Sequence, residues 1–589
     1  MKKHIIFGLL AGAAALSSCD DFLDDNRYPL DVQTDNPAYW TNKVNLQAQI
    51  NPLYENFTGY GSGGSWVNDF YYRSLSDDQC NAIGTGATIS FANWTYMRAQ
   101  STNSVWDASY EVVRRCNYII NNANLADKVE NDNFVAQARL IRAMQYYEMV
   151  RALGDVPLVT KVLDINSPEL YGERTPRNEV MDFVLEDLDF AVANITLKSS
   201  KVEFSKDLAN AMKSEICLYE AAFSKYHKND TERANKYYAE VIKACKEIMA
   251  SGYSICDDYR SIYNSYTAMT DNAPLGNASN SEIIFMRGYK TGTLGHSTAS
   301  FLSSETPICG MTKDAFDSYL FKDAKPLCST SYDTSDKATL DADGNFDISA
   351  LLAVRDGRLA QTIDSKLAFG NVSFTRVNSN TLNSTTGYTI CKYVSLETPY
   401  QQTVTAGQNS TCAPIYWLAF TYCDYLEARA ELNQLDDADV TMCVKPLWER
   451  AGIDTSKLNK AYLESMGDTA NNMGISSLLW EIRRLRRCEL MFDRNHRYWD
   501  LVRWHKLDLL DTNQHPNIAL GANVSMANDK QLGSVLKSGD YINAATAGDA
   551  VESRIFNDRY YLQPLGTTII RLYADKGLKL PQNPGWENN

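Results

Sequence analysis

The sequence predicts a mainly α-helical fold in which helix pairs stack on one another, together with a loop-rich region that carries a few short strands. Three observations predict it. Apolar residues recur at helical spacing in paired segments, glycine and proline punctuate those segments, and the composition turns rich in Gly, Ser, Thr and Asn between residues 252 and 412. The chain has 589 residues, 44% of them hydrophobic, which is enough for a large core.

The first two helices are marked by periodicity and by a stop signal. Spacings of three and four residues join Trp106, Tyr110, Val113, Asn117 and Ile120 on one amphipathic face. The stretch from Phe134 to Leu153 is the second helix. It ends at Gly154-Asp155-Val156-Pro157, a glycine followed by a proline, which is a typical helix end.

The later elements follow the same pattern. We expect helices over Arg177–Asn194, 206–227 and 231–250, a short strand at Glu282–Met286, and a short helix near Thr312–Phe321. Helices return at Ile415–Asn433, at about 440–452 and at 476–494. The helix-repeat scaffold therefore covers about 104–251 and 413–510, and its pairs are similar to tetratricopeptide repeats. Because one pair cannot bury its apolar face alone, residues 19–589 are expected to form a single body.

The N-terminus has the features of an export signal. Lys2 and Lys3 precede an apolar run of about a dozen residues, too short to span a bilayer. Leu16-Ser17-Ser18-Cys19 resembles the bacterial lipobox, so residues 1–18 are a predicted signal peptide and Cys19 a predicted lipidation site. An ordinary signal peptide with a cysteine early in the mature chain is the alternative. No later stretch is long and apolar enough to cross a membrane, so the lipid is the expected membrane attachment.

Charge and motif content exclude several classes of function. A net charge of −15 leaves no basic excess for binding nucleic acid. No Cys-x-x-Cys or Cys/His cluster has zinc-ligand spacing, and no Walker loop, His-Glu-x-x-His or Gly-x-Ser-x-Gly is present. We therefore expect no metal, no cofactor and no enzymatic activity. A two-carboxylate glycoside hydrolase stays open, because its carboxylates need only converge in space.

Two charged motifs receive a structural interpretation. Asp341-Ala342-Asp343-Gly344-Asn345-Phe346-Asp347 is similar to a calcium loop, but the first and last ligand positions would be Thr339 and Ala350, so a solvated turn is favoured. A run of arginines interleaved with acidic residues at helix-neighbour spacing favours an ion-pair network over an anion site: Arg483, Arg484, Arg486, Arg487, Arg494, Arg497 and Arg503.

Aromatic residues gather between positions 66 and 110. Trp66, Tyr71, Tyr72, Trp94 and Tyr96 lie among Asp69, Arg73, Asp77, Asp78 and Asn93, in a Gly/Ser-rich stretch without helical period. A sugar ring has an apolar face and a fringe of hydroxyl groups, so flat aromatic rings edged by Asp, Asn or Arg suit it. We expect Trp66 and Trp94 to stack on a sugar and Arg73 and Asp77 to bond its hydroxyls. The alternative is that about half of these aromatics are core.

Several motifs together resemble the SusD/RagB outer-membrane lipoproteins of Bacteroidetes. They are the lipobox with Cys19-Asp20-Asp21-Phe22-Leu23-Asp24, Trp106-Asp107-x-x-Tyr110 with Asn117, Arg142 to Tyr147 with Arg151 to Leu158, Ile482 to Leu490 with His496 to Leu501, and Leu562-Gln563-Pro564-Leu565 with Gln582-Asn583-Pro584-Gly585. Leu485, Cys488 and Asp493-Arg494-Asn495 depart from the usual residues of the arginine block. These departures touch the scaffold and leave the expected fold unchanged.

The resemblance implies a SusD-like fold with four tetratricopeptide-like helix pairs, anchored in the outer membrane and facing the cell exterior. It implies a protein that captures an oligosaccharide and delivers it to a SusC-like TonB-dependent transporter without chemistry. The same aromatics, Trp66, Tyr71, Tyr72, Trp94 and Tyr96, and also Tyr289 after the Ser281-Glu282-Ile283-Ile284-Phe285 strand, are the ligand contacts that it implies. A peptide ligand, as in the RagB branch, is the alternative.

Overall fold

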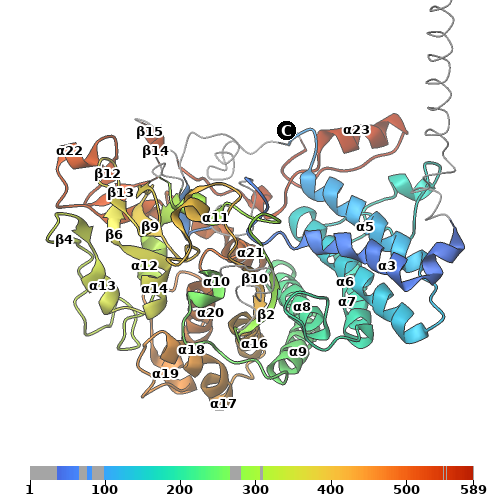
Figure 1. Cartoon of the computed structure of the whole chain (residues 1–589), viewed down its shortest axis with the longest axis horizontal. Coiled ribbons are helices and arrows are strands. Elements are labelled where there is room, and N and C mark those ends of the chain that lie inside the picture. The colour runs from blue at the N-terminus through green and yellow to red at the C-terminus, as the bar shows by residue number, and fades with distance from the viewer. Residues whose placement is uncertain are drawn as a thin grey trace, which may run out of the picture.

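The computed structural model describes residues 36–64, 76–81, 99–264, 280–304, 309–544, 546–547, 550–551 and 553–587. Figure 1 shows α3 and α5–α9 on one side, the strand-rich part with β4, β6, β9 and β13 on the other, and α16–α21 below and between them. The predicted mainly α fold with a few short strands is confirmed.

The first long helices begin and end where local chemistry dictates. In α5 (Ser104–Asn122) the Asn103 side chain accepts hydrogen bonds from the first free N–H groups, and in α6 (Lys128–Leu153) Asp127 does the same. The α6 helix stops at Gly154, whose φ of +76° suits a residue without a Cβ. The two helices pack on each other, and α6 also packs on α7 (Arg177–Asn194).

The next helix pair lies at the centre of the scaffold. The helix α8 (Lys206–Lys228) is buried on all sides from Asp207 to Ser224 and packs along α9 (Thr231–Met249). A helix buried all round belongs to the interior of a large protein. Buried charges on α8 therefore need partners from neighbouring elements.

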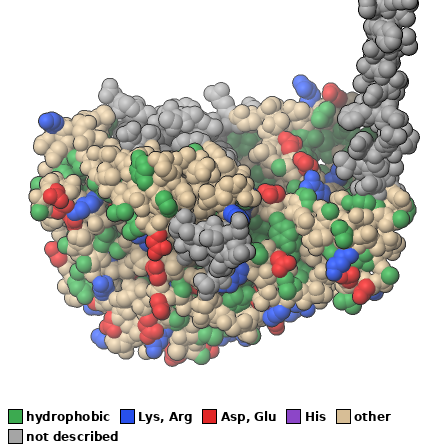
Figure 2. Space-filling view, in the orientation of Figure 1, with side chains coloured by type: hydrophobic (Ala, Val, Ile, Leu, Met, Phe, Trp, Pro, Cys, Tyr) green, Lys and Arg blue, Asp and Glu red, His purple; other side chains and the backbone are tan. Residues whose placement is uncertain are grey.

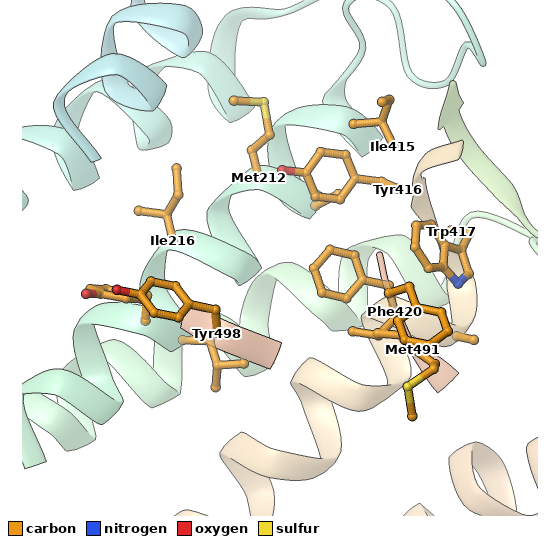
Figure 3. Close-up of a cluster of buried hydrophobic side chains, with 14 of the residues drawn as sticks. Met212, Ile216, Ile415, Tyr416, Trp417, Phe420, Met491 and Tyr498 are labelled. Carbon is orange, nitrogen blue, oxygen red and sulfur yellow. The ribbon is translucent and has the colours of Figure 1, made fainter. Parts of the chain in front are cut away.

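The second helical block joins the first through this central pair. The helix α16 (Leu418–Glu431) packs on α8, α9 and α20 (Ser477–Glu489), and α21 (His496–Arg503) packs on α8. Figure 3 shows Met212 and Ile216 of α8 in one apolar cluster with Tyr416, Phe420 and Tyr498. A single contiguous cluster of buried apolar side chains extends from Trp40 to Trp586.

Two predicted helices begin or end differently. The segment expected as a helix from Ile415 opens instead with strand β10 (Ala413–Trp417), which pairs antiparallel with β2 (Ile283–Arg287). A short apolar run that is buried all round does not by itself distinguish strand from helix. The helix expected to reach Arg494 ends at Glu489, and Phe492, Arg494 and Asn495 all have positive φ.

The remaining elements are short. The N-terminal part holds the 3-10 helix Pro37–Thr41, α3 (Lys43–Ile50), the 3-10 helix Asn51–Asn56, β1 (Gln79–Asn81), the 3-10 helix Pro168–Tyr171 and α10 (Ser261–Asn264). The loop-rich part holds α11 (Thr298–Leu302), β3 (Cys309–Met311), α12 (Lys313–Ser318), β4 (Thr339–Leu340), β5 (Phe346–Asp347), α13 (Ser349–Ala353), α14 (Gly357–Thr362), β6 (Ile363–Ala368), β7 (Phe374–Thr375), β8 (Thr381–Leu382), β9 (Gly387–Ile390) and α15 (Tyr400–Val404). Its largest sheet has the order β4-β5-β6-β9.

The C-terminal part returns over both halves. It holds α17 (Asp437–Asp439), the π-helix Val440–Val444, α18 (Lys445–Arg450), α19 (Lys460–Ser465), the 3-10 helices Leu507–Leu510, Pro516–Ile518 and Asp558–Tyr561, β11 (Leu520–Asn523), α22 (Asp529–Leu532), β12 (Lys537–Ser538), β13 (Tyr541–Asn543), β14 (Thr546–Ala547), β15 (Ala550–Val551) and α23 (Thr567–Asp575). None of the helices in the described ranges has the length and apolar character that crossing a bilayer requires.

Candidate functional site

The predicted ligand contacts divide into two groups. Asp77 and Tyr289 lie in described parts of the chain. The others lie outside the described residues, and so does the predicted lipidation site Cys19: Trp66, Tyr71, Tyr72, Arg73, Trp94 and Tyr96. The structure therefore describes the residues on either side of the two aromatic segments, 65–75 and 82–98.

Tyr289 supports the loop that leads into the first aromatic segment. Its side chain is 1% exposed, and its hydroxyl donates to the carbonyl oxygens of Gly61 (2.9 Å) and Thr58 (3.4 Å). Its ring packs with those of Tyr60 and His296, whose centroids are 6.3 and 4.6 Å away. This differs from the predicted ligand contact, because a ring enclosed on this scale has no free face for a sugar. Tyr289 positions the loop instead.

The same loop is held by backbone contacts that require glycine. The Gly63 N–H donates to the Gly295 carbonyl at 2.8 Å, and the Ser297 hydroxyl donates to the Gly63 carbonyl at 2.7 Å. The Gly407 N–H donates to that hydroxyl at 2.9 Å. A Cβ on Gly295 would lie 2.1 Å from the Gly407 carbonyl oxygen, so only glycine allows these two backbone segments to approach each other so closely. Segments near residues 63, 295 and 407 thus form one tight junction.

A pair of buried carboxylates follows the first aromatic segment in the sequence. Asp77 is 3% exposed and accepts two hydrogen bonds from Arg497, at 2.8 and 2.7 Å. Asp78 accepts one from Arg487 at 2.7 Å. Burial alone would raise the pKa of Asp77, but Arg487 and Arg497 outweigh it and hold that pKa below its ordinary value. Burial dominates at Asp78 and raises its pKa.

Asp77 is therefore corrected from a ligand contact to a structural ion-pair partner. Both of its carboxylate oxygens accept from Arg497, and its main-chain carbonyl accepts from the Thr312 hydroxyl at 2.6 Å. Arg554 adds hydrogen bonds to the carbonyls of Ser76 and Gln79. A carboxylate held in this way fixes the chain rather than reaching outward to a sugar hydroxyl.

The second aromatic segment is also fixed at both ends. It begins after β1, which pairs antiparallel with β3. It ends before Gln100, whose carbonyl accepts from the N–H of Thr567 at 2.9 Å, at the start of α23. Four distant parts of the chain, at residues 295–312, 407, 487–497 and 554–567, thus hold the ends of both segments in place.

The arginine block is an ion-pair network, as the sequence predicted. Each of its arginines has an acidic partner: Arg483 pairs with Glu431, Arg484 with Asp468, Arg486 with Asp424 and Asp500, Arg487 with Asp78 and Asp314, Arg494 with Glu215, Arg497 with Asp77, and Arg503 with Glu427. Two of these pairs reach the candidate region, so the scaffold and the ends of the aromatic segments share one network. Acidic and basic side chains are also interspersed on the face in Figure 2.

The acidic motif at 341–347 is a turn. Asp341 accepts from the backbone N–H groups of Asp343 (3.0 Å) and Asn345 (2.8 Å), and it also pairs with Lys366. The Lys366 ammonium group thus neutralises the carboxylate that a metal ion would need as a ligand. Among the described residues, no group of three or more His, Cys, Asp or Glu side chains is arranged to hold a metal ion.

A recess of about 550 Å³ opens elsewhere, where α7 and α9 begin and α8 ends. Three of its four lining cations form ion pairs: Arg177 and Arg233 share Glu220, and Arg233 and Lys236 share Asp182. None of the described side chains that line it is aromatic. It lacks the flat apolar faces that a sugar ring requires.

Comparisons with known proteins agree with this architecture. Residues 281–586 match the SusD family, and residues 22–218 match a family described as starch-binding and associating with the outer membrane. A SusD-like protein, P25, of Formosa agariphila is 23% identical over 298 residues, which cover 47% of this chain and 52% of that protein. The chain therefore spans about half the length of the curated relatives it matches.

Solved structures show the same fold over nearly the whole chain. A SusD-like carbohydrate-binding protein from Bacteroides fragilis superposes with a TM-score of 0.65 at 19% identity, covering 90% of this chain and 98% of the other. Surface glycan-binding protein A from Bacteroides fluxus superposes with a TM-score of 0.58 at 16% identity, covering 92% and 100%. At these identities the likeness establishes the fold.

Proposed function

The chain belongs to the SusD family, and from this membership we propose that it is a lipid-anchored glycan-binding protein on the outer face of the outer membrane. It captures an oligosaccharide and delivers it to a SusC-like TonB-dependent transporter. The starch-binding, outer-membrane description of the family matched by residues 22–218 supports this proposal, and so do the carbohydrate-binding and glycan-binding titles of the structural neighbours.

The observation that carries the proposal is the way the aromatic segments are held. The ends of segments 65–75 and 82–98 are fixed by buried ion pairs, by a β-pair and by a glycine junction. When the residues that flank a binding segment are already held in place, ligand binding costs less conformational entropy. We propose that the aromatic residues on these segments stack on the glycan and that Arg73 bonds its hydroxyls: Trp66, Tyr71, Tyr72, Trp94 and Tyr96.

We propose that binding proceeds without chemistry. A two-carboxylate hydrolase needs one carboxyl with a raised pKa that touches the substrate. Burial raises the pKa values of Asp78 and Asp424 to about 6 and that of Glu481 to about 7. Arg487, Arg486 and Arg484 respectively hold these three carboxyls in the core. None of the three is placed to meet a polysaccharide chain.

Calorimetric titration of the chain from residue 20 onward, against a panel of neutral oligosaccharides and peptides, tests the binding function. Saturable heat with one glycan class, and an unchanged oligosaccharide by chromatography after prolonged incubation, is the expected result. Saturable heat with peptides alone would establish the peptide-binding alternative, and release of shorter sugars would establish a hydrolase.

The partner and the anchor have their own test. The full chain, expressed with a SusC-like TonB-dependent transporter, should co-purify with that barrel from detergent-solubilised outer membrane. Cys19→Ala removes the predicted lipidation site, so this variant should leave the membrane fraction unless the barrel retains it. Recovery of both forms in the membrane when the barrel is absent would contradict the lipid anchor.

A further inference from the structure

We propose a further ligand-binding surface, a neutral sugar-ring subsite built on Tyr400. It consists of the exposed side chains of Val377, Leu396 and Tyr400 together with Asn378 and Asn380, and we call it the Tyr400 platform. This inference rests on the proposed glycan-binding function and names a contact that the sequence did not suggest.

Tyr400 presents a flat ring whose orientation is fixed. The side chain is 43% exposed, and its hydroxyl donates to the Asn380 side-chain oxygen at 2.7 Å. Tyr400 is the first residue of α15 and follows Pro399, whose ring restricts the backbone there. A tyrosine has few rotatable bonds, so a ring held at both ends offers contact area at low entropic cost.

The turn formed by residues 376–380, which contacts Tyr400 through Asn380, is held in place by its own hydrogen bonds. Arg376 is 6% exposed and donates to Asp364 (2.8 Å) and to the carbonyls of Leu302 and Ile390. Asn378 has a φ of +56°, and its side chain donates to the Leu396 carbonyl at 2.9 Å. Two asparagines therefore join the turn 376–380 to the segment 395–400, and the surface is formed before any ligand binds.

The chemistry of this surface suits an uncharged sugar. Val377 is 64% exposed and Leu396 is 48% exposed, so the two segments that Asn378 and Asn380 join also expose apolar side chains. Within residues 374–382 and 395–404, the charged residues are the buried Arg376 and the exposed Glu397. Pyranose rings bind through an apolar C–H face and hydroxyl edges, which here meet an aromatic ring, two aliphatic side chains and amide groups.

The platform adjoins the loop that leads to the aromatic segments. Its helix α15 packs on α11, which is labelled near the middle of Figure 1. The chain continues from α15 to Gly407, which meets Ser297 and Gly63 at the glycine junction. The platform is thus connected through described residues to Gly63, the last part of the loop before the first aromatic segment in the sequence. The ligand class is the same at both places.

Three variants and one panel test the proposal. The chain from residue 20 onward is titrated by calorimetry with neutral malto-, laminari-, xylo- and manno-oligosaccharides of two to seven rings. For the oligosaccharide that binds, Tyr400→Ala should weaken affinity about tenfold, the loss typical of a truncated contact anchor. Tyr400→Phe keeps the ring and should change affinity less than threefold.

The matched control is Tyr332, a tyrosine of similar exposure (39%) that stacks on Phe321 and belongs to neither segment of the platform. Tyr332→Ala should leave affinity unchanged. Wild-type affinity in Tyr400→Ala, with a folded circular dichroism spectrum, would overturn the platform and leave the proposed function standing. A wild-type chain that binds peptides, or no oligosaccharide of the panel, would overturn both.

Discussion

Asp77 and Arg497 form a buried two-point ion pair, with Nε–Oδ1 and Nη2–Oδ2 distances of 2.8 and 2.7 Å, although 420 residues separate them in the chain. Asp77 is the second residue after the first aromatic segment, and Arg497 lies on α21 in the helical scaffold. The pair therefore connects helix α21 directly to the residues that follow the first aromatic segment in the sequence. Removing it should affect both stability and binding.

Asp77→Ala should lower the free energy of unfolding by about 3–5 kcal/mol, because it leaves the Arg497 charge buried without its partner. Urea denaturation followed by fluorescence measures this change. The control is Glu464→Ala in the exposed pair Lys460–Glu464, which should cost less than about 1 kcal/mol. If the two variants lose similar stability, Asp77 is not the structural anchor described here. In a double-mutant cycle, Asp77→Ala with Arg497→Ala should cost less than the sum of the single losses.

Stability should fall as the pH rises from about 5 to 7, and Glu481 is one cause. Burial, with a further contribution from Asp468, raises its pKa to about 7 against the pull of Arg484, whereas an unfolded glutamate titrates near about 4.3. Between these values the native state binds the extra proton, so raising the pH favours unfolding. The midpoint of urea denaturation at pH 5, 6, 7 and 8 tests this. Glu481→Gln cannot ionise, and its profile should be flatter; an equally steep profile would exclude Glu481.

Stability should fall again at acidic pH through Glu427. Burial would raise the pKa of Glu427, but Arg503, with Arg483 and Arg486, outweighs it and lowers the pKa to about 2. Because the pKa of Glu427 is lower in the folded than in the unfolded protein, its ionised carboxylate stabilises the fold at pH values above the unfolded pKa. This stabilisation is lost as the pH falls from about 4 towards 2. Denaturation midpoints at pH 4, 3 and 2.5 measure it. Glu427→Gln should be less stable at neutral pH and should lose less on acidification; the same acid loss as wild type would contradict the assignment.

Gly295→Ala should weaken ligand binding, because a Cβ would lie 2.1 Å from the Gly407 carbonyl and force the junction at Gly63 apart. Calorimetry with the oligosaccharide that binds wild type, together with a thermal melt, measures both effects. Gly64→Ala is the control, since its Cβ would lie 3.9 Å from Ala406, an ordinary contact. Unchanged affinity in Gly295→Ala would show that the junction does not position the binding segment.

Trp94→Ala should weaken glycan binding by about 1–3 kcal/mol if this side chain stacks on the sugar. Trp94→Phe retains a flat ring and should lose less. Calorimetric titration of the two variants beside wild type gives the comparison. Equal affinities in all three would remove Trp94 from the site and leave the remaining aromatics of the segments as candidates.

The helices were largely predictable because their information is local. The α7 helix has the bounds Arg177–Asn194 that the sequence predicted, and α6 stops at Gly154 as its glycine and proline indicate. The arginine block was correctly interpreted as an ion-pair network, but helix-neighbour spacing accounts for only part of it. Arg484 pairs with Glu481 and Arg503 with Asp500 at i,i+3, whereas most other partners come from distant segments. The segment at Ile415 was predicted as a helix because a buried apolar run has no periodicity, and only its pairing with β2 makes it a strand.

The candidate site was less predictable, because burial is a property of the assembled molecule. Asp77 and Tyr289 have the residue types that bind sugars, and their pairing with Arg497 and Gly61 depends on segments hundreds of residues away. Tyr400 was not predicted as a contact from the sequence, because its exposure and its hydrogen bond to Asn380 appear only in the folded chain.

The sequence by itself therefore determined the helices, the family and the class of ligand to test, since periodicity, capping and motif order are written along the chain. Only the tertiary structure decided which polar and aromatic groups face solvent and which are core. A buried charge needs a partner of opposite charge, and that partner comes from any segment that lies nearby in the fold, however far away it is in the sequence.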